Sequence, residues 1–287
     1  MEKYTREGLK GGWGDMKIVE ARSKRGPGTS APIEEELEIY EEFFKIAIGN
    51  KKKTRNLVLG GTPELRDLAL KYGSETIAVD ISPKLLLALT NVMEHKNEDN
   101  NKFMIGDWLD MGKFLQRNSF DIILADLSIN NIPFEKWESL FNTLKKLLKK
   151  KGYFIIRHIN YNQSKKFKDY KKIIDDFNSG KNTLLGLVFE CGFCTGLSQK
   201  AYNTNKKEFV WKSVIDELNI LKDMLDKKDA VNFDNLTAHA KYHTSIATSE
   251  KEFHKLIRKY FWIKKIGIIN RLVFSHYMPI YLLRTRC

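Results

Sequence analysis

Short apolar segments alternate with amphipathic ones between residues 56 and 158, and this alternation limits the fold more than any other feature of the chain. The segment 56–60, "NLVLG", has the apolar, β-branched character of a buried strand, and helical spacing with a glycine stop follows at 64–73. The later strand candidates are 76–80, 102–105, 120–126 and 152–158, and the later helix candidates are 82–95 and 134–150. Strands that alternate with helices build βαβ units, so the sequence predicts a doubly wound α/β sheet.

The first strand candidate ends in a glycine turn. Gly60 and Gly61 have no Cβ, so the backbone can turn sharply there and come close to a ligand, and Pro63 fixes φ just before the helix. In doubly wound sheets the first strand-to-helix turn usually contacts the cofactor. The turn has neither G-x-G-x-x-G nor G-x-x-x-x-G-K-[ST], which indicates a ligand other than a pyrophosphate.

Three carboxylates stand at the ends of successive strand candidates. Asp80 ends the segment 76–80, 19 positions after Gly61, while Asp107 follows the third candidate and Asp126 ends the fourth. A single aspartate in such a place is more often a helix cap or a loop residue. Because the carboxyl ends of parallel strands share one edge of the sheet, three in register predict a site for an adenosine-bearing ligand without a phosphate cradle.

At this point the sequence resembles the class I S-adenosylmethionine-dependent methyltransferases. The resemblance runs over residues 56–158 through "LGGTPELRDLA", "AVDISP", "GDWLDM" and "FDIILADLSINNIP", and it returns at 260–269 and 276–286, which look like the closing antiparallel strand pair. Within that class the chain is similar to a subgroup with an L-G-x-T-P-E-L first motif. The resemblance implies S-adenosylmethionine as cofactor and a seven-stranded Rossmann-like sheet with an antiparallel last strand, a helical N-terminal segment and a helical insertion.

The resemblance also implies the cofactor contacts. Residues 60–62 would lie beside the methionine part, Asp80 would accept hydrogen bonds from the ribose hydroxyls, and Ile81 would lie against the adenine. Asp107 would receive the adenine amine, and Trp108 would flank the ring. The full set of implied contacts is Gly60, Gly61, Thr62, Pro63, Asp80, Ile81, Gly106, Asp107, Trp108, Asp126, Leu127, Ser128 and Trp13. For Trp13, which lies in a glycine-rich segment, the alternative is a loop residue without a ligand.

His158 and Asp126 are the candidate catalytic residues. His158, at the end of the fifth strand candidate, would take a proton from an attacking hydroxyl or amine; the alternative is a hydrogen-bonded structural histidine. Asp126 would hold a substrate amine or orient the cofactor, and the resemblance places it with Leu127 and Ser128 at the floor where cofactor meets substrate. Methyl transfer asks little more of such groups than to hold the methyl carbon in line with a nucleophile.

The chain divides into four expected regions. The region after the fifth strand is longer than a normal crossover and is predicted to be mostly helical, including 207–228. Tyr161, Tyr202 and Tyr242 are candidates for the acceptor pocket there. The expected regions are 1–54, an N-terminal lid and helix; 55–159, the S-adenosylmethionine-binding core; 160–250, a helical cover and substrate region; and 251–287, a C-terminal helix and the closing strand pair.

The net charge of +13 leaves two classes of acceptor open. Lysine supplies most of the basic residues, and lysine suits a solvated surface at least as well as phosphate recognition. Residues 251–287 carry nine Lys or Arg against Glu252, but the segment "DLSINN" does not match the N-P-P-[FYW] type of base-amine methylases. We therefore expect methyl transfer to an oxygen or nitrogen of a small molecule; the alternatives are an RNA methyltransferase and a non-catalytic S-adenosylmethionine-binding protein.

Other patterns predict neither a metal site nor a membrane span. The three cysteines form no disulfide framework, and Cys191 and Cys194 have no second pair. His239 and His243 have no evident third ligand, so no metal is expected. No window approaches the roughly 18–20 apolar residues of a membrane span. With no apolar signal region at its start, the protein is expected to be cytoplasmic and not bound to a membrane.

Overall fold

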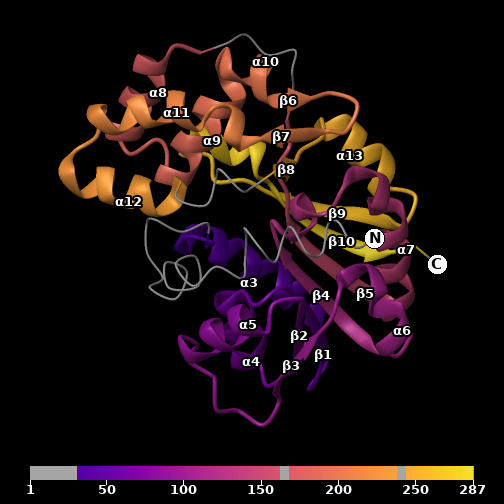
Figure 1. The fold of residues 1–287 in the computed structure, drawn as a ribbon. Helices are drawn as coiled ribbons and strands as arrows, with labels where there is room; N and C mark the ends of the chain where they lie inside the picture. The colour runs from indigo at the N-terminus through magenta and orange to yellow at the C-terminus, as the bar shows by residue number, and fades with distance from the viewer. Residues whose placement is uncertain (1–30, 162–167, 238–243, 287) are drawn as a thin grey trace. The chain divides into compact units, whose positions relative to one another are not determined.

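The computed structural model describes residues 31–161, 168–237 and 244–286, and the chain divides into two compact units (Figure 1). The sheet unit comprises Ala31–His158, Lys251–Gly267 and the chain from Pro279 onward. The second unit contains Ile159–Glu250 and Ile268–Met278. The residues that the sequence assigns to the cofactor and that the structure describes all belong to the sheet unit.

The sheet unit is built on seven strands in the order β3-β2-β1-β4-β5-β10-β9. The first five strands along the chain pair with one another in parallel, and β10 runs antiparallel to both β5 and β9. The strand order reverses between β1 and β4, which is where doubly wound sheets bind their ligands. The predicted seven-stranded fold with its antiparallel last strand is confirmed. The strands are β1 (Arg55–Leu59), β2 (Glu75–Asp80), β3 (Asn101–Ile105), β4 (Phe120–Asp126), β5 (Leu148–Arg157), β9 (Phe261–Gly267) and β10 (Ile280–Thr285).

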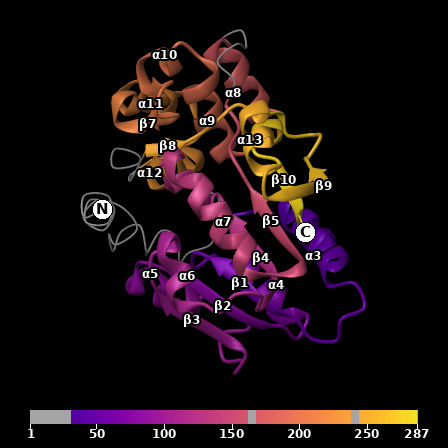
Figure 2. The ribbon, with the colours of Figure 1, turned by 90° about the vertical axis from the view of Figure 1, so that its right-hand side faces the viewer.

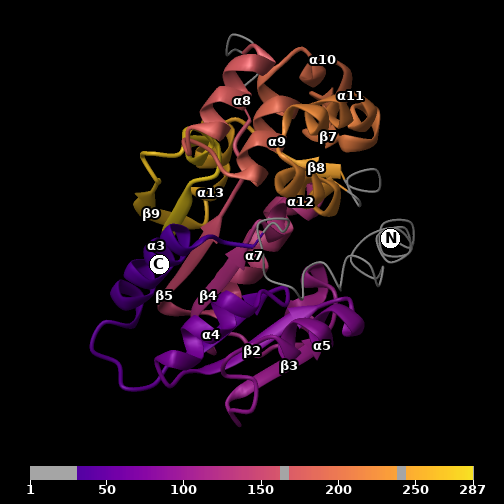
Figure 3. The same ribbon diagram turned by 90° about the vertical axis from the view of Figure 1, so that its left-hand side faces the viewer.

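Helices cover both faces of this sheet. Figure 3 shows α3, α4 and α5 on one face, and Figure 2 shows α7 on the other. Tyr40 and Phe44 of α3 and Leu65 of α4 pack with Val58 and Leu124 of the sheet in one buried cluster. None of the described helices is long and apolar enough to cross a membrane. The helices are α3 (Glu34–Ile48), α4 (Pro63–Lys71), α5 (Pro83–Asn91), α6 (Met111–Phe114), α7 (Trp137–Leu147) and α13 (Glu250–Ile257), with the 3-10 turns η1 (Trp108–Asp110), η2 (Ser128–Asn131) and η3 (Phe134–Lys136).

Local sequence signals start the helices that lead away from β1 and β2. Pro63 opens α4 and Pro83 opens α5, and proline is tolerated there because the first amides of a helix have no intrahelical partner. The Ser82 hydroxyl accepts a hydrogen bond from the Leu85 amide at 3.2 Å and so caps the start of α5, a role that serine favours. These starts fix where the chain leaves the edge of the sheet.

The second unit differs from prediction at 207–228. The sequence predicts one helix there, but β7 pairs with β6 and β8 in a small antiparallel sheet, and only short helical turns follow. Phe209 and Trp211 are buried, with ring centroids 4.5 Å apart, so pairing with distant segments outweighs local helical spacing. The elements are α8 (Tyr170–Asn178), α9 (Leu184–Cys194), α10 (Leu197–Ala201), β6 (Tyr202–Asn203), β7 (Glu208–Val210), η4 (Trp211–Ser213), α11 (Ile215–Asn219), η5 (Ile220–Met224), α12 (Lys227–Thr237), β8 (Thr244–Ile246) and η7 (Val273–Tyr277).

Candidate functional site

One carbonyl group joins the turn after β1 to the loop after β3. The Val79 carbonyl in β2 accepts hydrogen bonds from the Gly60 amide at 2.8 Å and from the Trp108 indole nitrogen at 2.6 Å. Gly60 has φ +98°, a backbone conformation that residues other than glycine rarely adopt. The indole is therefore held beside the glycine turn at the carboxyl edge of the sheet.

Asp80 also lies beside the glycine turn. The carboxylate is buried at the end of β2, and its Oδ1 accepts the Ser82 amide at 2.8 Å. A Cβ atom on Gly60 would stand 3.7 Å from Asp80 Oδ2 and 3.7 Å from the Trp108 ring. Only hydrogen at position 60 thus keeps this space open between a carboxylate and an indole. A carboxylate suits ribose hydroxyls and an aromatic plane suits a purine, so these residues fit an adenosine group.

The loop after β3 is tied to β2 by its backbone. The Gly106 amide donates to the Asp80 carbonyl at 3.0 Å, and a Cβ on Gly106 would stand 2.5 Å from the Phe114 ring. Asp107 caps η1, because its Oδ1 accepts the Leu109 amide at 2.9 Å. The loop is therefore held next to Asp80, with Asp107 half-buried at the start of η1.

The loop after β4 completes the edge. Leu127 has φ +53°, an uncommon left-handed conformation for a branched side chain. Its amide donates to the Arg157 carbonyl at 3.1 Å, and the Ser128 hydroxyl donates to the Leu59 carbonyl at 2.7 Å. The loop is thus fastened to the ends of β1 and β5 on either side of β4.

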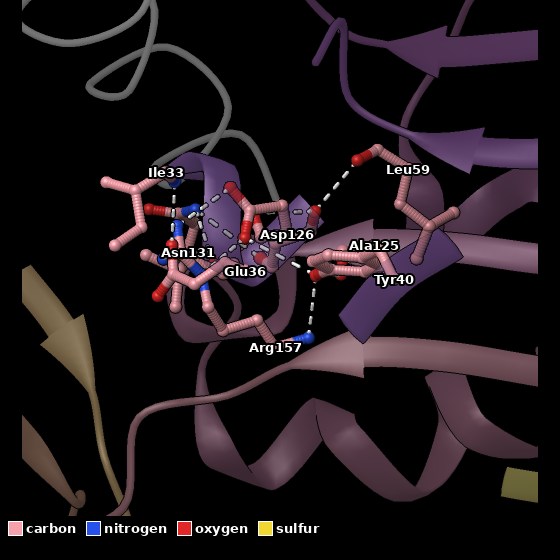
Figure 4. Close-up of polar contacts among 10 residues, drawn as sticks. Ile33, Glu36, Tyr40, Leu59, Ala125, Asp126, Asn131 and Arg157 are labelled. Carbon is pink, nitrogen blue, oxygen red and sulfur yellow. Dashed lines mark hydrogen bonds and ion pairs between the residues drawn. The ribbon is translucent and has the colours of Figure 1, made fainter. Parts of the chain in front are cut away.

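A buried ion-pair network lies under that loop (Figure 4). Arg157 Nε donates to Asp126 Oδ1 at 2.6 Å and Nη2 donates to Oδ2 at 3.1 Å, while Nη1 donates to Glu36. The Tyr40 hydroxyl donates to the Ala125 carbonyl at 2.8 Å and accepts the Arg157 amide at 3.0 Å. Burial opposes the positive charge of Arg157, but Asp126 and Glu36 raise the pKa of the guanidinium above its usual range. Glu36, Tyr40 and Arg157 were not predicted from the sequence. Glu36 and Tyr40 stand four residues apart on the buried face of α3, and this spacing is the sequence signal that could have indicated them.

This network changes the role of Asp126. Both carboxylate oxygens accept hydrogen bonds from Arg157, and 2% of the side chain is exposed. The geometry therefore favours Asp126 as a positioning residue for the loop after β4 over a residue that contacts a substrate amine.

His158 is enclosed by the hydrophobic core of the sheet unit. Its ring stacks on Phe253 at 4.2 Å and meets the edge of Trp137 at 5.3 Å, and Nδ1 lies 3.2 Å from the Asn130 side-chain nitrogen. Burial, aided by the nearby His254, lowers the pKa of His158 to about 3. A fully buried imidazole with so low a pKa is a poor proton acceptor, so the geometry favours the structural alternative over the catalytic role.

Other sequence candidates lie outside this edge. Tyr161 and Tyr202 come together in the second unit, with ring centroids 4.3 Å apart. Cys191 and Cys194 are buried and are not joined in a disulfide, and burial raises the pKa of Cys191. Trp13 and Tyr242 lie outside the described residues.

Known proteins share this architecture. A family model described as "Methyltransferase domain" matches residues 62–259. A Rhodobacter sphaeroides protein provisionally named among the Zn-dependent alcohol dehydrogenases has a TM-score of 0.56 and 15% identity, covering 94% of this chain and 99% of that one. PH0226 from Pyrococcus horikoshii OT3 has a TM-score of 0.54 and 13% identity, with coverage of 92% and 97%. Geranyl diphosphate C-methyltransferase from Streptomyces coelicolor A3(2) has a TM-score of 0.50 and 10% identity, with coverage of 87% and 79%. Such identities show a shared fold alone, and no curated protein sequence matches.

Proposed function

Because the chain belongs to the methyltransferase-domain family and is an S-adenosylmethionine-dependent methyltransferase, we propose that it methylates an oxygen or nitrogen atom of a small molecule. The observation that carries the proposed site is the Val79 carbonyl, which accepts hydrogen bonds from the Gly60 amide and the Trp108 indole and so holds the glycine turn next to both Asp80 and the indole. We further infer the subgroup with the L-G-x-T-P-E-L first motif and, since the cysteine pattern does not predict a disulfide framework, a cytoplasmic location.

Each part of the carboxyl edge receives a proposed role. Asp80 would accept the ribose hydroxyls, and Trp108 would lie against the adenine. The backbone at Gly60 and Gly61 would border the methionine part, since a glycine there leaves room for the ligand. The remaining proposed cofactor contacts are Thr62, Pro63, Ile81, Gly106, Asp107, Leu127 and Ser128.

The chemistry of this site is positional. When bound, S-adenosylmethionine supplies a methyl group on a positively charged sulfur, which a hydroxyl or amine can attack directly. The protein would hold the two reactants in line, and the Arg157–Asp126 pair would keep the loop after β4 in place for this. Neither His158 nor Asp126 is needed as a base in this scheme.

The second unit is the proposed source of acceptor selection. It contains Tyr161 and Tyr202 in mutual contact, with Phe193 5.2 Å from Tyr161. These rings belong to one aromatic group, and the two tyrosines add hydroxyls to its apolar surface. Such a group suits a small, partly apolar acceptor. The fold is also that of a methyltransferase whose acceptor is geranyl diphosphate, which is a small molecule.

Calorimetry tests the cofactor site. The full chain should bind S-adenosylmethionine and S-adenosylhomocysteine, and Asp80→Ala should weaken both about 10- to 100-fold, the loss expected for hydrogen bonds to a charged group. Asp110→Ala is the matched control, because Asp110 forms an ion pair with Lys113 on the surface of the adjacent turn. If the unmodified protein binds neither compound, the assignment of the site is wrong.

The acceptor class is tested separately. The protein is incubated with cell extract and S-adenosylmethionine labelled in its methyl group, and the products are separated by size and by nuclease treatment. Label in the small-molecule fraction supports the proposal. Label in a nuclease-sensitive fraction would replace it with the RNA methyltransferase alternative.

A further inference from the structure

The amino edge of the sheet, where the parallel strands begin, carries a row of aromatic and arginine side chains. Arg284 on β10 is the register partner of Tyr153 on β5 and of Trp262 on β9, so the three side chains share one face of the sheet. The Arg284 guanidinium lies 5.8 Å from the Tyr153 ring centroid, and that of Arg286 lies 3.8 Å from the Trp262 centroid. Trp262 is 52% exposed, so part of its surface is available to a ligand.

A lysine bulge lies beside this row. Leu148 pairs with Phe120 but Tyr153 pairs with Ile122, so the four residues 149–152 bulge out of the sheet. The Thr285 hydroxyl lies 3.4, 3.0 and 3.3 Å from the carbonyl oxygens of Lys149, Lys150 and Gly152. The bulge is therefore fastened to β10 between Arg284 and Arg286. The amino-edge cluster consists of Lys149, Lys150, Lys151, Trp262, Arg284 and Arg286.

The positive charge of the amino-edge cluster is poorly compensated. The Asp121 carboxylate forms an ion pair with Lys149 Nζ at 2.7 Å, but it also forms one with Lys51 Nζ at 2.7 Å. Within the described part of the chain, no carboxylate forms an ion pair with Arg284 or Arg286. All three lysines of the bulge are exposed. Among the described residues, the two arginines and Lys149, which shares Asp121 with Lys51, leave an excess of positive charge at this edge, an arrangement that attracts a polyanion.

We propose that the amino-edge cluster binds single-stranded nucleic acid, with an unpaired base stacked on Trp262 and phosphates along the lysine bulge and the two arginines. Exposed aromatic rings among cations are the usual means of binding single strands, since every base has a π-face. Arg286 keeps the Trp262 ring in place. The Arg286 amide donates to the Tyr260 carbonyl at 3.1 Å, and the Arg286 guanidinium stacks on the Trp262 indole. Duplexes offer no unpaired base to the ring.

This binding site does not depend on the proposed methyl transfer. The amino-edge cluster lies where β5 begins, whereas Arg157 and the methyl-donor residues lie where the parallel strands end. Nucleic acid bound at the cluster is accordingly held for docking rather than as the methyl acceptor. Its affinity should be the same with and without S-adenosylhomocysteine, and the same in Asp80→Ala. A failure of either proposal therefore leaves the other standing.

Fluorescence anisotropy with a labelled single-stranded RNA of roughly 12 nucleotides tests the proposal. Binding to the full chain should fall roughly 100-fold between about 50 and 200 mM salt, as expected for around five phosphate contacts. Trp262→Ala should weaken binding about 5- to 100-fold, while Trp262→Phe should retain most of it, which separates stacking from misfolding. Phe103→Ala, at an exposed aromatic on the opposite outer strand, is the control and should leave affinity unchanged.

Charge variants complete the test. The double variant Arg284→Gln/Arg286→Gln should lower the slope of log affinity against log salt by the equivalent of about 1 to 2 phosphate contacts. The charge-matched Lys102→Gln/Lys113→Gln should leave this slope unchanged. Binding without salt dependence, or equal loss in Trp262→Ala and Phe103→Ala, would overturn the proposal. Binding to vesicles with anionic headgroups but not to RNA would assign the cluster to a membrane surface instead.

Discussion

Replacing Arg157 by methionine removes the cation that Glu36 and Asp126 share. The three side chains are 1%, 8% and 2% exposed, so the two carboxylates would be left in the interior without their counterion. Breaking a buried ion pair from one side costs about 3–5 kcal/mol. We expect Arg157→Met to lose about that much of its free energy of unfolding, while methionine fills much of the same volume.

The triple variant Glu36→Leu/Asp126→Leu/Arg157→Met should recover most of this loss. Replacing a complete buried ion group with apolar side chains is often neutral or stabilising. The part not recovered should be about 1 kcal/mol, because the Glu36 carboxylate also accepts the Ile33 amide at 3.0 Å at the start of α3.

Urea denaturation followed by circular dichroism at neutral pH measures these free energies of unfolding, with the slope checked for two-state behaviour. S-adenosylhomocysteine affinity should fall in the single and triple variants alike, because both lose the tie between β5 and the end of β4. The reasoning is refuted if Arg157→Met loses less than about 1 kcal/mol, or if the triple variant is no more stable than the single one.

Two further predictions concern the glycine turn and the buried histidine. Gly60→Ala should lower S-adenosylhomocysteine affinity at least about tenfold by calorimetry, because the alanine backbone is strained at φ +98° and its Cβ narrows the space for the ligand. Gly73→Ala is the control: it has φ +67° and nothing within 4 Å of the added Cβ, so it should lose stability without losing affinity. His158→Gln should keep kcat within about threefold, since a group with a pKa of about 3 is a poor base. In the unfolded chain His158 binds a proton below pH ~6.5, whereas in the folded chain it does so only near pH 3. The unmodified protein should therefore lose stability as the pH falls from about 6.5 to 3, and His158→Gln should lose less. A tenfold or greater fall in kcat for His158→Gln, with its fold intact, would restore the catalytic role.

The sequence by itself determined the sheet and the edge that holds the proposed cofactor residues. Strand and helix periodicity, the glycine turn and the Ser82 N-cap are local signals that do not depend on distant parts of the chain. The position of Asp80 at the end of β2 follows from them, since parallel strands end at a common edge. These local rules agree with one another in the sheet unit, which is why the fold could be predicted there.

Only the tertiary structure decided how the candidate side chains are paired and buried. Asp126 is occupied by Arg157, 31 residues away, which also reaches Glu36, 121 residues away; no local pattern encodes such pairs. Phe253 and Trp137 enclose His158, and burial, aided by His254, lowers its pKa, so the geometry favours the structural alternative. Desolvation and charge pairing depend on everything packed around a group, so they emerge only when distant segments meet in the folded chain.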